Sequence, residues 1–502
     1  MLQRNNFSSD KNSLRCYNEA VPKFYITTAI PYVNAKPHVG HALEFIQADV
    51  IARYHRVMGD EVILLSGGDE NALKNVQAAE KAGVPVQQFV DTNSMLFAEL
   101  AKSLNVQFDV FQRGSSQEHH IASQKLWELC SKNGDIYKKI YTGLYCVGCE
   151  LFYEKDELDE NGQCYEHPGK KLEEVSEENY FFRLSKYQNQ LLSLLEKDEL
   201  VIIPQTRKNE ALSFLKKNTL QDISISRSNK RAKNWGVPVP GDEDQRMYVW
   251  FDALNIYQSG VGFGSDEAHY RKWWPADVHV IGKGILRFHA IYWPAFLLSA
   301  HLPIPKSLFV HGYFTVNGQK MSKTIGNVID PLDIIKVYGV DGFRYYVLSD
   351  IPPTGDGDFS ESRLKEVYNA DLANGLGNLV ARVAKLCESA HFVEMSANST
   401  TSEHVMDVAE YTTALNEYRF NDCLKFVFGK VKDLNHFIDT EKPWDLLKVQ
   451  DRRINGVLNH CVDALQEIAV LLQPFLPETS EKILEQFKGP EIKADKPLFP
   501  RL

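Results

Sequence analysis

The amino-terminal part of the chain alternates strand-like and helix-like segments. Residues 23–30, KFYITTAI, are rich in β-branched and aromatic side chains and end at Pro31, as a strand does. Apolar residues then recur at helical spacing from Val39, and residues 61–67, EVILLSG, form a second apolar run that ends at glycines. Such alternation is typical of an open parallel α/β sheet, in which ligands bind beyond the carboxyl ends of the strands.

The pattern changes further along the chain. Between about residues 130 and 245 there are paired Cys and His positions, acidic runs and a basic stretch, which favour an insertion that splits the sheet. Strand signals return at 278–284 and 307–324, where Asn317-Gly318 predicts a hairpin turn. After residue 360 the pattern is that of successive amphipathic helices.

We therefore predict a split Rossmann-like parallel sheet with an inserted connective domain and a carboxyl-terminal helical bundle. The predicted parts are a loose tail over 1–22, the first half of the sheet domain over 23–130, the insertion over 131–245, the second half over 246–310, a region over 311–365 that carries the segment GQKMSKT and a helical domain over 366–502.

Composition limits the class of protein. The 502 residues are 44% hydrophobic and 24% charged, and no apolar run approaches the roughly 18–20 residues of a membrane span. The net charge of −10 argues against a protein coated in nucleic acid, although a local basic surface can still hold a structured RNA. Eight cysteines scattered over the chain indicate a reducing compartment, so we expect a cytoplasmic protein, with an organellar transit peptide as the alternative for the first 22 residues.

Two histidines stand where the first predicted helix begins. A helix amino terminus has unpaired N–H groups and a partial positive charge, so it suits phosphate. His38 and His41 share a face at this spacing, and Gly40 between them lets a ligand approach the backbone. The pair predicts a phosphate site, with two surface histidines as the alternative.

Two lysines follow the predicted hairpin. Lys320 and Lys323 lie in the segment 318–324, GQKMSKT. Ammonium groups on a loop suit a polyphosphate whose charge shifts during a reaction, whereas a solvated charged turn is the alternative.

Together, His-Val-Gly-His and Lys-Met-Ser-Lys-Thr resemble the HIGH and KMSKS signatures of class I aminoacyl-tRNA synthetases. Members of that family use ATP to form an aminoacyl adenylate and then pass the amino acid to tRNA. The in-line attack on the α-phosphate needs positioning and charge stabilisation rather than a protein nucleophile. The resemblance implies that His38 and His41 hold the phosphates and that Lys320 and Lys323 close over the leaving pyrophosphate, with Mg²⁺ accompanying ATP.

Within that class, the chain from about Lys23 to its end is similar to the methionyl-tRNA synthetase family, through AIPYVNAKPHVGH, SGGDENA, YVWFDALNIY and IGKGILRFHAIYWP. The resemblance implies a ligase that activates L-methionine with ATP and charges tRNA(Met). It implies that Asp69 binds the substrate ammonium. It implies a methionine pocket formed by Ile30, Tyr32, Asp69, Trp250, Ala253, Leu254, Tyr257, Ile285 and His289. It implies ATP contacts from His38, Gly40, His41, Lys283, Lys320 and Lys323.

The predicted pocket suits its substrate chemically. Aromatic and aliphatic walls with a few polar hydrogens match a polarizable thioether, whereas core aromatics are the alternative for Trp250 and Tyr257. The related enzymes for leucine, isoleucine and valine carry a large inserted editing domain, and the insertion in this chain is too short for one.

The insertion contains two tight pairs of potential metal ligands. Cys146 and Cys149 form one pair, and Cys164 and His167 form the other. This spacing predicts one structural zinc ion, with reduced cysteines in a polar loop as the alternative. The methionyl enzymes are similar in carrying zero, one or two such knuckles.

The helical part resembles the anticodon-reading region of the same family in NGLGNLVAR (374–382) and EKPWDLL (441–447). By that resemblance, Asn378, Arg382 and Trp444 contact the CAU anticodon. Amide, guanidinium and indole groups suit splayed bases. An exposed polar face, and a tryptophan that joins two helices, are the alternatives.

The chain departs from the family pattern in several places. Asn71-Ala72 replaces the usual His-Gly, Gly284 replaces an aspartate, Leu254 replaces a proline, and Thr324 replaces a serine. Two other functions stay open: a nucleotidyltransferase that adenylates another small molecule, since such enzymes share an H-x-G-H-like helix start, and an RNA-binding protein that has lost catalysis, which Asn71 and Gly284 favour. We expect a monomer, because the appended β-barrel through which some relatives pair is missing.

Overall fold

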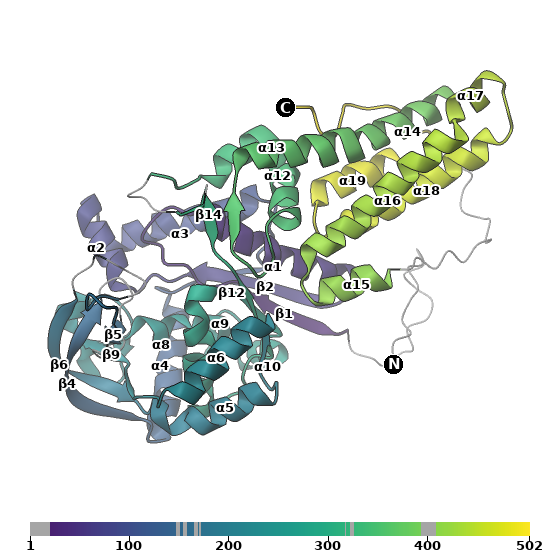
Figure 1. Ribbon diagram of the computed structural model, residues 1–502. Coiled ribbons are helices and arrows are strands. Elements are labelled where there is room, and N and C mark those ends of the chain that lie inside the picture. Colours follow the sequence, from purple (N-terminus) through teal and green to yellow (C-terminus); the bar gives the residue numbers. More distant parts are fainter. Residues whose placement is uncertain are drawn as a thin grey trace. The chain divides into compact units, whose positions relative to one another are not determined.

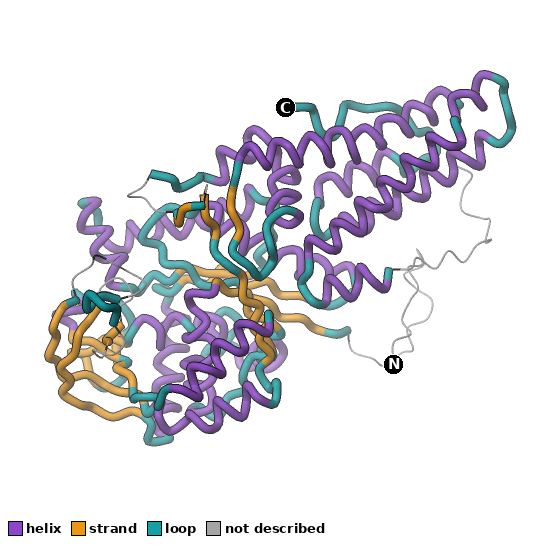
Figure 2. Tube along the Cα trace, in the orientation of Figure 1, coloured by secondary structure: helices purple, strands orange, loops and turns teal. Residues whose placement is uncertain are grey.

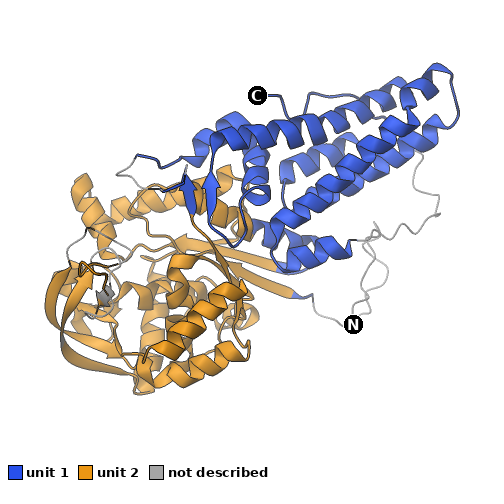
Figure 3. Ribbon diagram, viewed as in Figure 1, with its two compact units in different colours: residues 1–22, 49–61, 314–502 blue, residues 23–48, 62–313 orange. Residues whose placement is uncertain are grey.

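The computed structural model describes residues 21–146, 151–153, 158–164, 169, 172–316, 318–321, 326–392 and 408–502. The described chain forms two compact units (Figure 3). Unit 2 comprises Lys23–Ala48 and Val62–Tyr313, and unit 1 includes Asp49–Glu61 and Phe314–Leu502.

Unit 2 contains a sheet with the strand order β3-β2-β1-β12-β13-β7 among the described residues. Its pairs β2–β3, β1–β12, β12–β13 and β13–β7 are parallel, which confirms the predicted parallel α/β sheet. The chain adds β2 and β3 on one side of β1 and the other strands on its other side, so the carboxyl ends of β1 and β12 flank a topological switch point. The strands are β1 (Lys23–Thr27), β2 (Glu61–Gly68), β3 (Val110–Arg113), β7 (Val201–Ile203), β12 (Val278–Gly282) and β13 (Ser307–His311).

Helices connect these strands, as the apolar spacing predicted. The first begins at Val39, and its apolar stripe is buried at Leu43, Ile46 and Val50. The helices that begin in unit 2 are α1 (Val39–Val57), α2 (Leu73–Ala82), α3 (Val86–Ser103), α4 (Gln117–Lys132), α5 (Gln188–Glu196), α6 (Gln205–Lys217), α7 (Asn229–Ala232), α8 (Val249–Ala253), α9 (Ile256–Ser259), α10 (Glu267–Trp273) and α11 (Trp293–Ser299), with the short turns η2 (Leu184–Tyr187), η3 (Lys283–Ile285) and η4 (Phe288–Tyr292).

The predicted insertion contributes small antiparallel sheets, which Figure 2 shows as orange strands at one end of unit 2. One has the order β5-β4-β6-β8, from β4 (Ile136–Cys146), β5 (Leu151–Tyr153), β6 (Glu173–Phe182) and β8 (Ile223–Ser224). The other has the order β10-β11-β9, from β9 (Ser226–Ser228), β10 (Pro238–Val239) and β11 (Asp242–Met247). The range 131–245 also supplies β7 to the parallel sheet. The domain boundaries stay predictions.

Unit 1 combines a small sheet with a helical bundle (Figure 1). β14 and β15 are antiparallel, with Val316 paired to Gln319, which agrees with the predicted hairpin; Asn317 lies outside the described residues. The strands are β14 (Phe314–Val316), β15 (Gln319–Lys320) and β16 (Gly357–Phe359). The helices are α12 (Pro331–Ser349), α13 (Glu361–Val367), η5 (Tyr368–Gly377), α14 (Asn378–Ser389), α15 (Ala409–Asn416), α16 (Phe420–Glu441), α17 (Pro443–Lys448), α18 (Ile454–Leu472) and α19 (Pro477–Gln486), which confirms the predicted carboxyl-terminal helical region.

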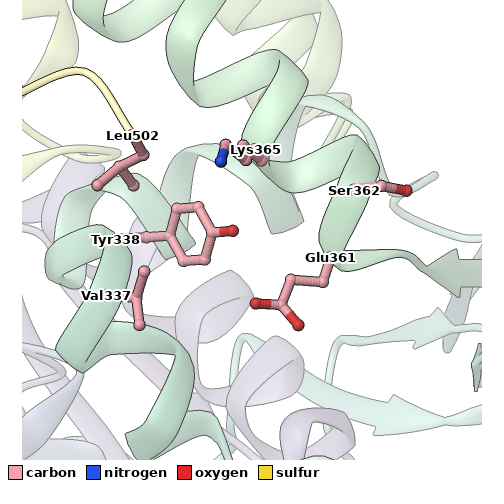
Figure 4. Close-up of a pocket in the computed structure, with 6 residues that line it drawn as sticks. All are labelled: Val337, Tyr338, Glu361, Ser362, Lys365 and Leu502. Atoms are coloured by element: carbon pink, nitrogen blue, oxygen red, sulfur yellow. The ribbon is translucent and has the colours of Figure 1, made fainter.

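Unit 1 also has an open hollow of about 500 Å³ between α12, α13 and the last residue (Figure 4). Its lining contains none of the predicted site residues and consists of Val337, Tyr338, Glu361, Ser362, Lys365 and Leu502. None of the described helices combines the length and the apolar composition that a membrane span requires.

Candidate active site

The turn from β1 into α1 holds both histidines of the first motif. Their rings lie 4.0 Å apart between centroids. The Nδ1 atom of His38 accepts a hydrogen bond from Gly40 N at 3.1 Å, and the Nδ1 atom of His41 accepts one from His38 N at 3.1 Å. A neutral ring that accepts at Nδ1 carries its proton on Nε2, so each imidazole has an Nε2–H donor suited to a phosphate oxygen.

The electrostatics of the turn keep His41 neutral. Burial, with further contributions from the charges of His38 and His311, lowers the pKa of His41 well below its usual value. The His41 ring also meets Phe97 edge to face at 5.0 Å. At neutral pH His41 therefore acts as a hydrogen-bond donor rather than as a cation.

A carboxylate one helical turn further along α1 fixes this turn to the sheet. Glu44 accepts a hydrogen bond from Ala29 N at 2.9 Å through Oε1, and its Oε2 lies 2.9 Å from Nε2 of His311. Ala29 follows β1, and His311 ends β13. Glu44 thus joins the start of α1 to the carboxyl ends of two strands, where an α/β sheet binds its ligands.

The aromatic residues predicted for the methionine pocket are brought together in unit 2. Trp250 on α8 stacks on Phe288 at 3.6 Å with an interplanar angle of 7°. It also meets Tyr32 edge to face at 6.2 Å and His289 at 6.5 Å. Leu254 and Tyr257 belong to the same hydrophobic cluster, and Ile30 and Ile285 pack against it, while Ala253 is buried on α8.

A hydrogen-bonded pair forms the polar part of this group. The Nδ1 atom of His289 lies 2.9 Å from the carbonyl oxygen of Ile285, so it must carry the proton of the neutral ring. The Nε2 atom then accepts the hydrogen bond from the Tyr257 hydroxyl at 2.8 Å. Burial lowers the pKa of His289 to about 4, which keeps the ring neutral.

The loop after β2 places Asp69 beside Tyr32. The two residues form an isolated parallel bridge, and Asp69 N donates to Pro31 O at 2.9 Å. Asn75 Nδ2 donates to the carbonyl oxygen of Asp69 at 2.8 Å. The ammonium of Lys74 lies 3.2 Å from the centroid of the Tyr32 ring, a cation–π contact that fixes this ring.

The predicted segment IGKGILRFHAIYWP, which begins at the end of β12, is crowded at Gly284. A Cβ atom at this residue would lie 1.8 Å from Oη of Tyr313, so the tyrosine hydroxyl occupies the space of a side chain. The ammonium of Lys283 lies 4.7 Å from the centroid of the same Tyr313 ring. Gly284 lacks the carboxylate that is usual in the family, and the hydroxyl of Tyr313 lies where that side chain would begin.

Several predicted residues lie wholly or partly outside the described chain. The backbone of Lys320 belongs to β15, but its side chain and all of Lys323 lie outside the described residues. Of the predicted zinc ligands, Cys146 ends β4 and Cys164 is buried, whereas Cys149 and His167 lie outside the described residues. Within the described ranges there is no group of His, Cys, Asp and Glu that could hold a metal ion.

Two of the predicted anticodon residues, Arg382 and Trp444, are in contact within unit 1. The guanidinium of Arg382 on α14 lies 5.1 Å from the centroid of the Trp444 ring on α17 and pairs with Asp439 at 2.5 Å. Asn378, one turn before Arg382, is exposed. A cation above an indole, beside an exposed amide, is a surface on which bases can stack.

Sequence reasoning missed some residues that the structure adds to the site. Glu44 could have been found from its position three residues after His41, on the same helix face. His311 stands at the carboxyl end of a predicted strand, which is also a signal. Phe288 precedes His289, but its stacking on Trp250 depends on tertiary packing and has no local signal.

Family models match most of the chain. Residues 24–384 match the model described as "tRNA synthetases class I (M)". Residues 402–501 match the "Anticodon-binding domain of tRNA ligase".

Relatives of known name match over nearly the whole length. A methionine–tRNA ligase of Brucella suis is 40% identical, over 95% of this chain and 98% of the relative. One of Thermotoga maritima is 41% identical, over 92% of this chain and 75% of the relative. The structure of Mycobacterium tuberculosis methionyl-tRNA synthetase in complex with methionyl-adenylate has a TM-score of 0.89 at 36% identity and covers 96% of this chain and 100% of that chain. Since the class I family model matches residues 24–384 and named methionine–tRNA ligases are about 40% identical over most of the chain, the chain belongs to the class I tRNA synthetases of the methionine type.

Proposed function

We propose that the chain is a methionine–tRNA ligase. It activates L-methionine with ATP to methionyl adenylate and pyrophosphate, and then transfers methionine to tRNA(Met). The identity of 40% over 95% of the chain with a named methionine–tRNA ligase supports this reaction. The observation in the structure that carries the proposal is the hydrogen-bonded turn at His38 and His41, whose backbone contacts place a proton on Nε2 of each neutral ring.

The roles of the phosphate-binding residues follow from charge. During adenylate formation the methionine carboxylate attacks the α-phosphate, the bond to the β-phosphate breaks, and negative charge builds on pyrophosphate. We assign His38, His41 and the backbone at Gly40 to the phosphates of ATP, supplied as its Mg²⁺ complex. Lys283 contacts the nucleotide. By the motif resemblance, Lys320 and Lys323 neutralise the charge on pyrophosphate.

The methionine pocket is assigned to the aromatic group in unit 2. Asp69 binds the substrate ammonium, and Trp250, Tyr257 and His289 surround the side chain. The stacking of Trp250 on Phe288 and the cation–π contact of Lys74 with Tyr32 support a pocket with fixed walls. The remaining lining is assigned to Ile30, Tyr32, Ala253, Leu254 and Ile285.

A zinc ion is part of the proposal. The thiols of Cys146 and Cys164 are both buried, and Cys164 Sγ lies 3.3 Å from the hydroxyl of Tyr153, on the strand that pairs with β4. Buried thiols beside a hairpin suit a closed tetrahedral site. We assign Cys146, Cys149, Cys164 and His167 as its ligands; zinc would stiffen this loop. Metal analysis of purified protein, with Cys164→Ser as the comparison, tests the assignment.

For tRNA we assign Asn378, Arg382 and Trp444 to the anticodon. The pairing of Arg382 with Trp444 supports a stacking platform. We propose a cytoplasmic monomer. The buried thiols of Cys130, Cys387, Cys423 and Cys461 favour a reducing compartment.

ATP–pyrophosphate exchange, run with each amino acid in turn, tests the function. Exchange that depends on methionine supports the proposal, and exchange with another small molecule supports a different adenylating enzyme. Absence of exchange with every amino acid contradicts the ligase and favours a protein that only binds RNA. His41→Ala measures the role of the histidine turn and should lower kcat for exchange by about 100-fold.

A further inference from the structure

A buried carboxylate joins the loop that carries Asp69 to the helix that carries Trp250. Asp252 lies on α8 and is 2% exposed. Its Oδ2 accepts a hydrogen bond from Asn71 Nδ2 at 2.7 Å, and its Oδ1 lies 2.6 Å from His119 Nε2. Ser123 Oγ donates to the same Oδ1 at 3.0 Å. Such donors are required, because a buried carboxylate without partners is strongly destabilising.

The charge of this carboxylate is maintained by its neighbours. Burial alone raises the pKa of Asp252, but the charge and hydrogen bond of His119, with the amide of Asn71, outweigh it and hold the pKa below its usual value. Asp252 is therefore ionised at neutral pH and needs a donor at each oxygen. At Oδ2 that donor is the side chain of Asn71.

Asn71 makes a second contact that fixes the loop. The same Nδ2 donates to the carbonyl oxygen of Gly114 at 2.8 Å. Gly114 N in turn donates to Gly68 O at 3.1 Å, and Trp235 Nε1 donates to Glu70 O at 2.7 Å. One amide thus connects the Asp69 loop to α8 and to the segment after β3, with both of its hydrogens used.

We propose that Asn71 is a positioning residue for methionine, because it sets the spacing between Asp69 and the wall formed by Trp250. The inference rests on the proposed function, in which Asp69 binds the ammonium and Trp250 bounds the side chain of one substrate molecule. The usual histidine of the family is absent here, and the amide of Asn71 directs a neutral donor at Asp252. Loss of that donor leaves both substrate contacts present but changes the distance between them.

Three substitutions test whether the hydrogen bond of Asn71, rather than the size of its side chain, controls the binding of methionine. Asn71→Ala removes the donor and should raise KM for methionine in pyrophosphate exchange by about 10-fold, with KM for ATP within about twofold of the wild type. Asn71→Asp has the same shape but turns an acceptor toward Asp252 and toward Gly114 O, so it should raise the same KM by about 100-fold. Asn71→His offers a ring N–H to Asp252 and should restore KM to within about threefold of the wild type.

A matched control exists in the same unit. Asn133 Nδ2 donates to Asp135 Oδ2 at 2.8 Å, the same chemical bond, but neither residue belongs to the proposed pocket. Asn133→Ala should lower Tm without changing KM for methionine.

The outcomes distinguish the inference from the proposed function. If the wild type shows no methionine-dependent exchange, the proposed function fails. If the wild type exchanges normally and Asn71→Asp is better tolerated than Asn71→Ala, shape rather than hydrogen bonding matters and the inference is wrong. An unchanged methionine KM in all three variants also overturns it. Should Asn71→Ala not fold, the comparison of Asn71→Asp with Asn71→His gives the same decision.

Discussion

Replacing Tyr257 with phenylalanine removes one hydroxyl from the proposed methionine pocket. That hydroxyl donates at 2.8 Å to Nε2 of His289, and both side chains are 1% exposed. The proton on Nδ1 is held by the Ile285 carbonyl, so Nε2 becomes a buried acceptor without its donor. Such a group costs about 1–3 kcal/mol, which corresponds to about 5- to 150-fold in an equilibrium constant. We expect Tm to fall and KM for methionine to rise by about 10-fold, with KM for ATP unchanged.

A double-mutant cycle measures the bond itself. His289→Leu removes the acceptor, so it should cost less in the Tyr257→Phe background than in the wild type. The expected coupling is about 1 kcal/mol in methionine binding, measured from pyrophosphate exchange at varied methionine concentrations. Strictly additive effects, or a Tyr257→Phe enzyme with wild-type KM for methionine, would show that the pair does not hold the pocket.

Three further predictions follow from separate parts of the molecule. Burial lowers the pKa of His289 in the folded chain to about 4, whereas its value in the unfolded chain is 6.5. Below pH 6.5 the unfolded chain therefore binds a proton that the folded chain does not. Acidification from pH 8 to pH 5 should thus lower the free energy of unfolding by about 2 kcal/mol through this group. His289→Leu should therefore lose less Tm on acidification than the wild type; an equal loss contradicts the lowered pKa. Gly284→Asp should cost about 1–3 kcal/mol of stability through its clash with Tyr313, and less in a Tyr313→Ala background; equal Tm losses in both backgrounds exclude this clash. Trp444→Ala should raise KM for tRNA(Met) in aminoacylation roughly 10-fold without changing methionine-dependent exchange, and a matching loss of exchange argues against an anticodon role.

The sequence predicts the parallel sheet well because its signals are local. The strand before Pro31 and the helix from Val39 show their periods within a short window, and both are present. The pairing of residues 201–203 with β13 was not predicted. That run is only three residues long, and its place in the sheet is set by contacts with strands far away in the sequence.

In the candidate site too, the sequence predicts individual residues but not the contacts between them. Motif residues such as Tyr257 and His289 could be selected from the sequence, because each lies in a short segment that resembles a motif of the family. Their hydrogen bond could not, because it depends on the backbone carbonyl of Ile285 fixing the tautomer. The Glu44–His311 contact joins residues 267 positions apart and likewise needs the fold to bring them together.

Two of the departures from the family pattern, at residues 71 and 284, can be explained by the side chains that surround them. At residue 284 the Tyr313 hydroxyl occupies the space of a side chain, and at residue 71 the asparagine amide donates to Asp252. In both places the neighbouring group satisfies the space or the charge that the substitution changes, so neither leaves a void or an unpaired buried carboxylate. Asp252 is buried and needs these partners for stability in any folded form of the chain, so the hydrogen bonds of Asn71 do not separate an active ligase from an RNA-binding relic. A measured methionine-dependent exchange rate decides between the two.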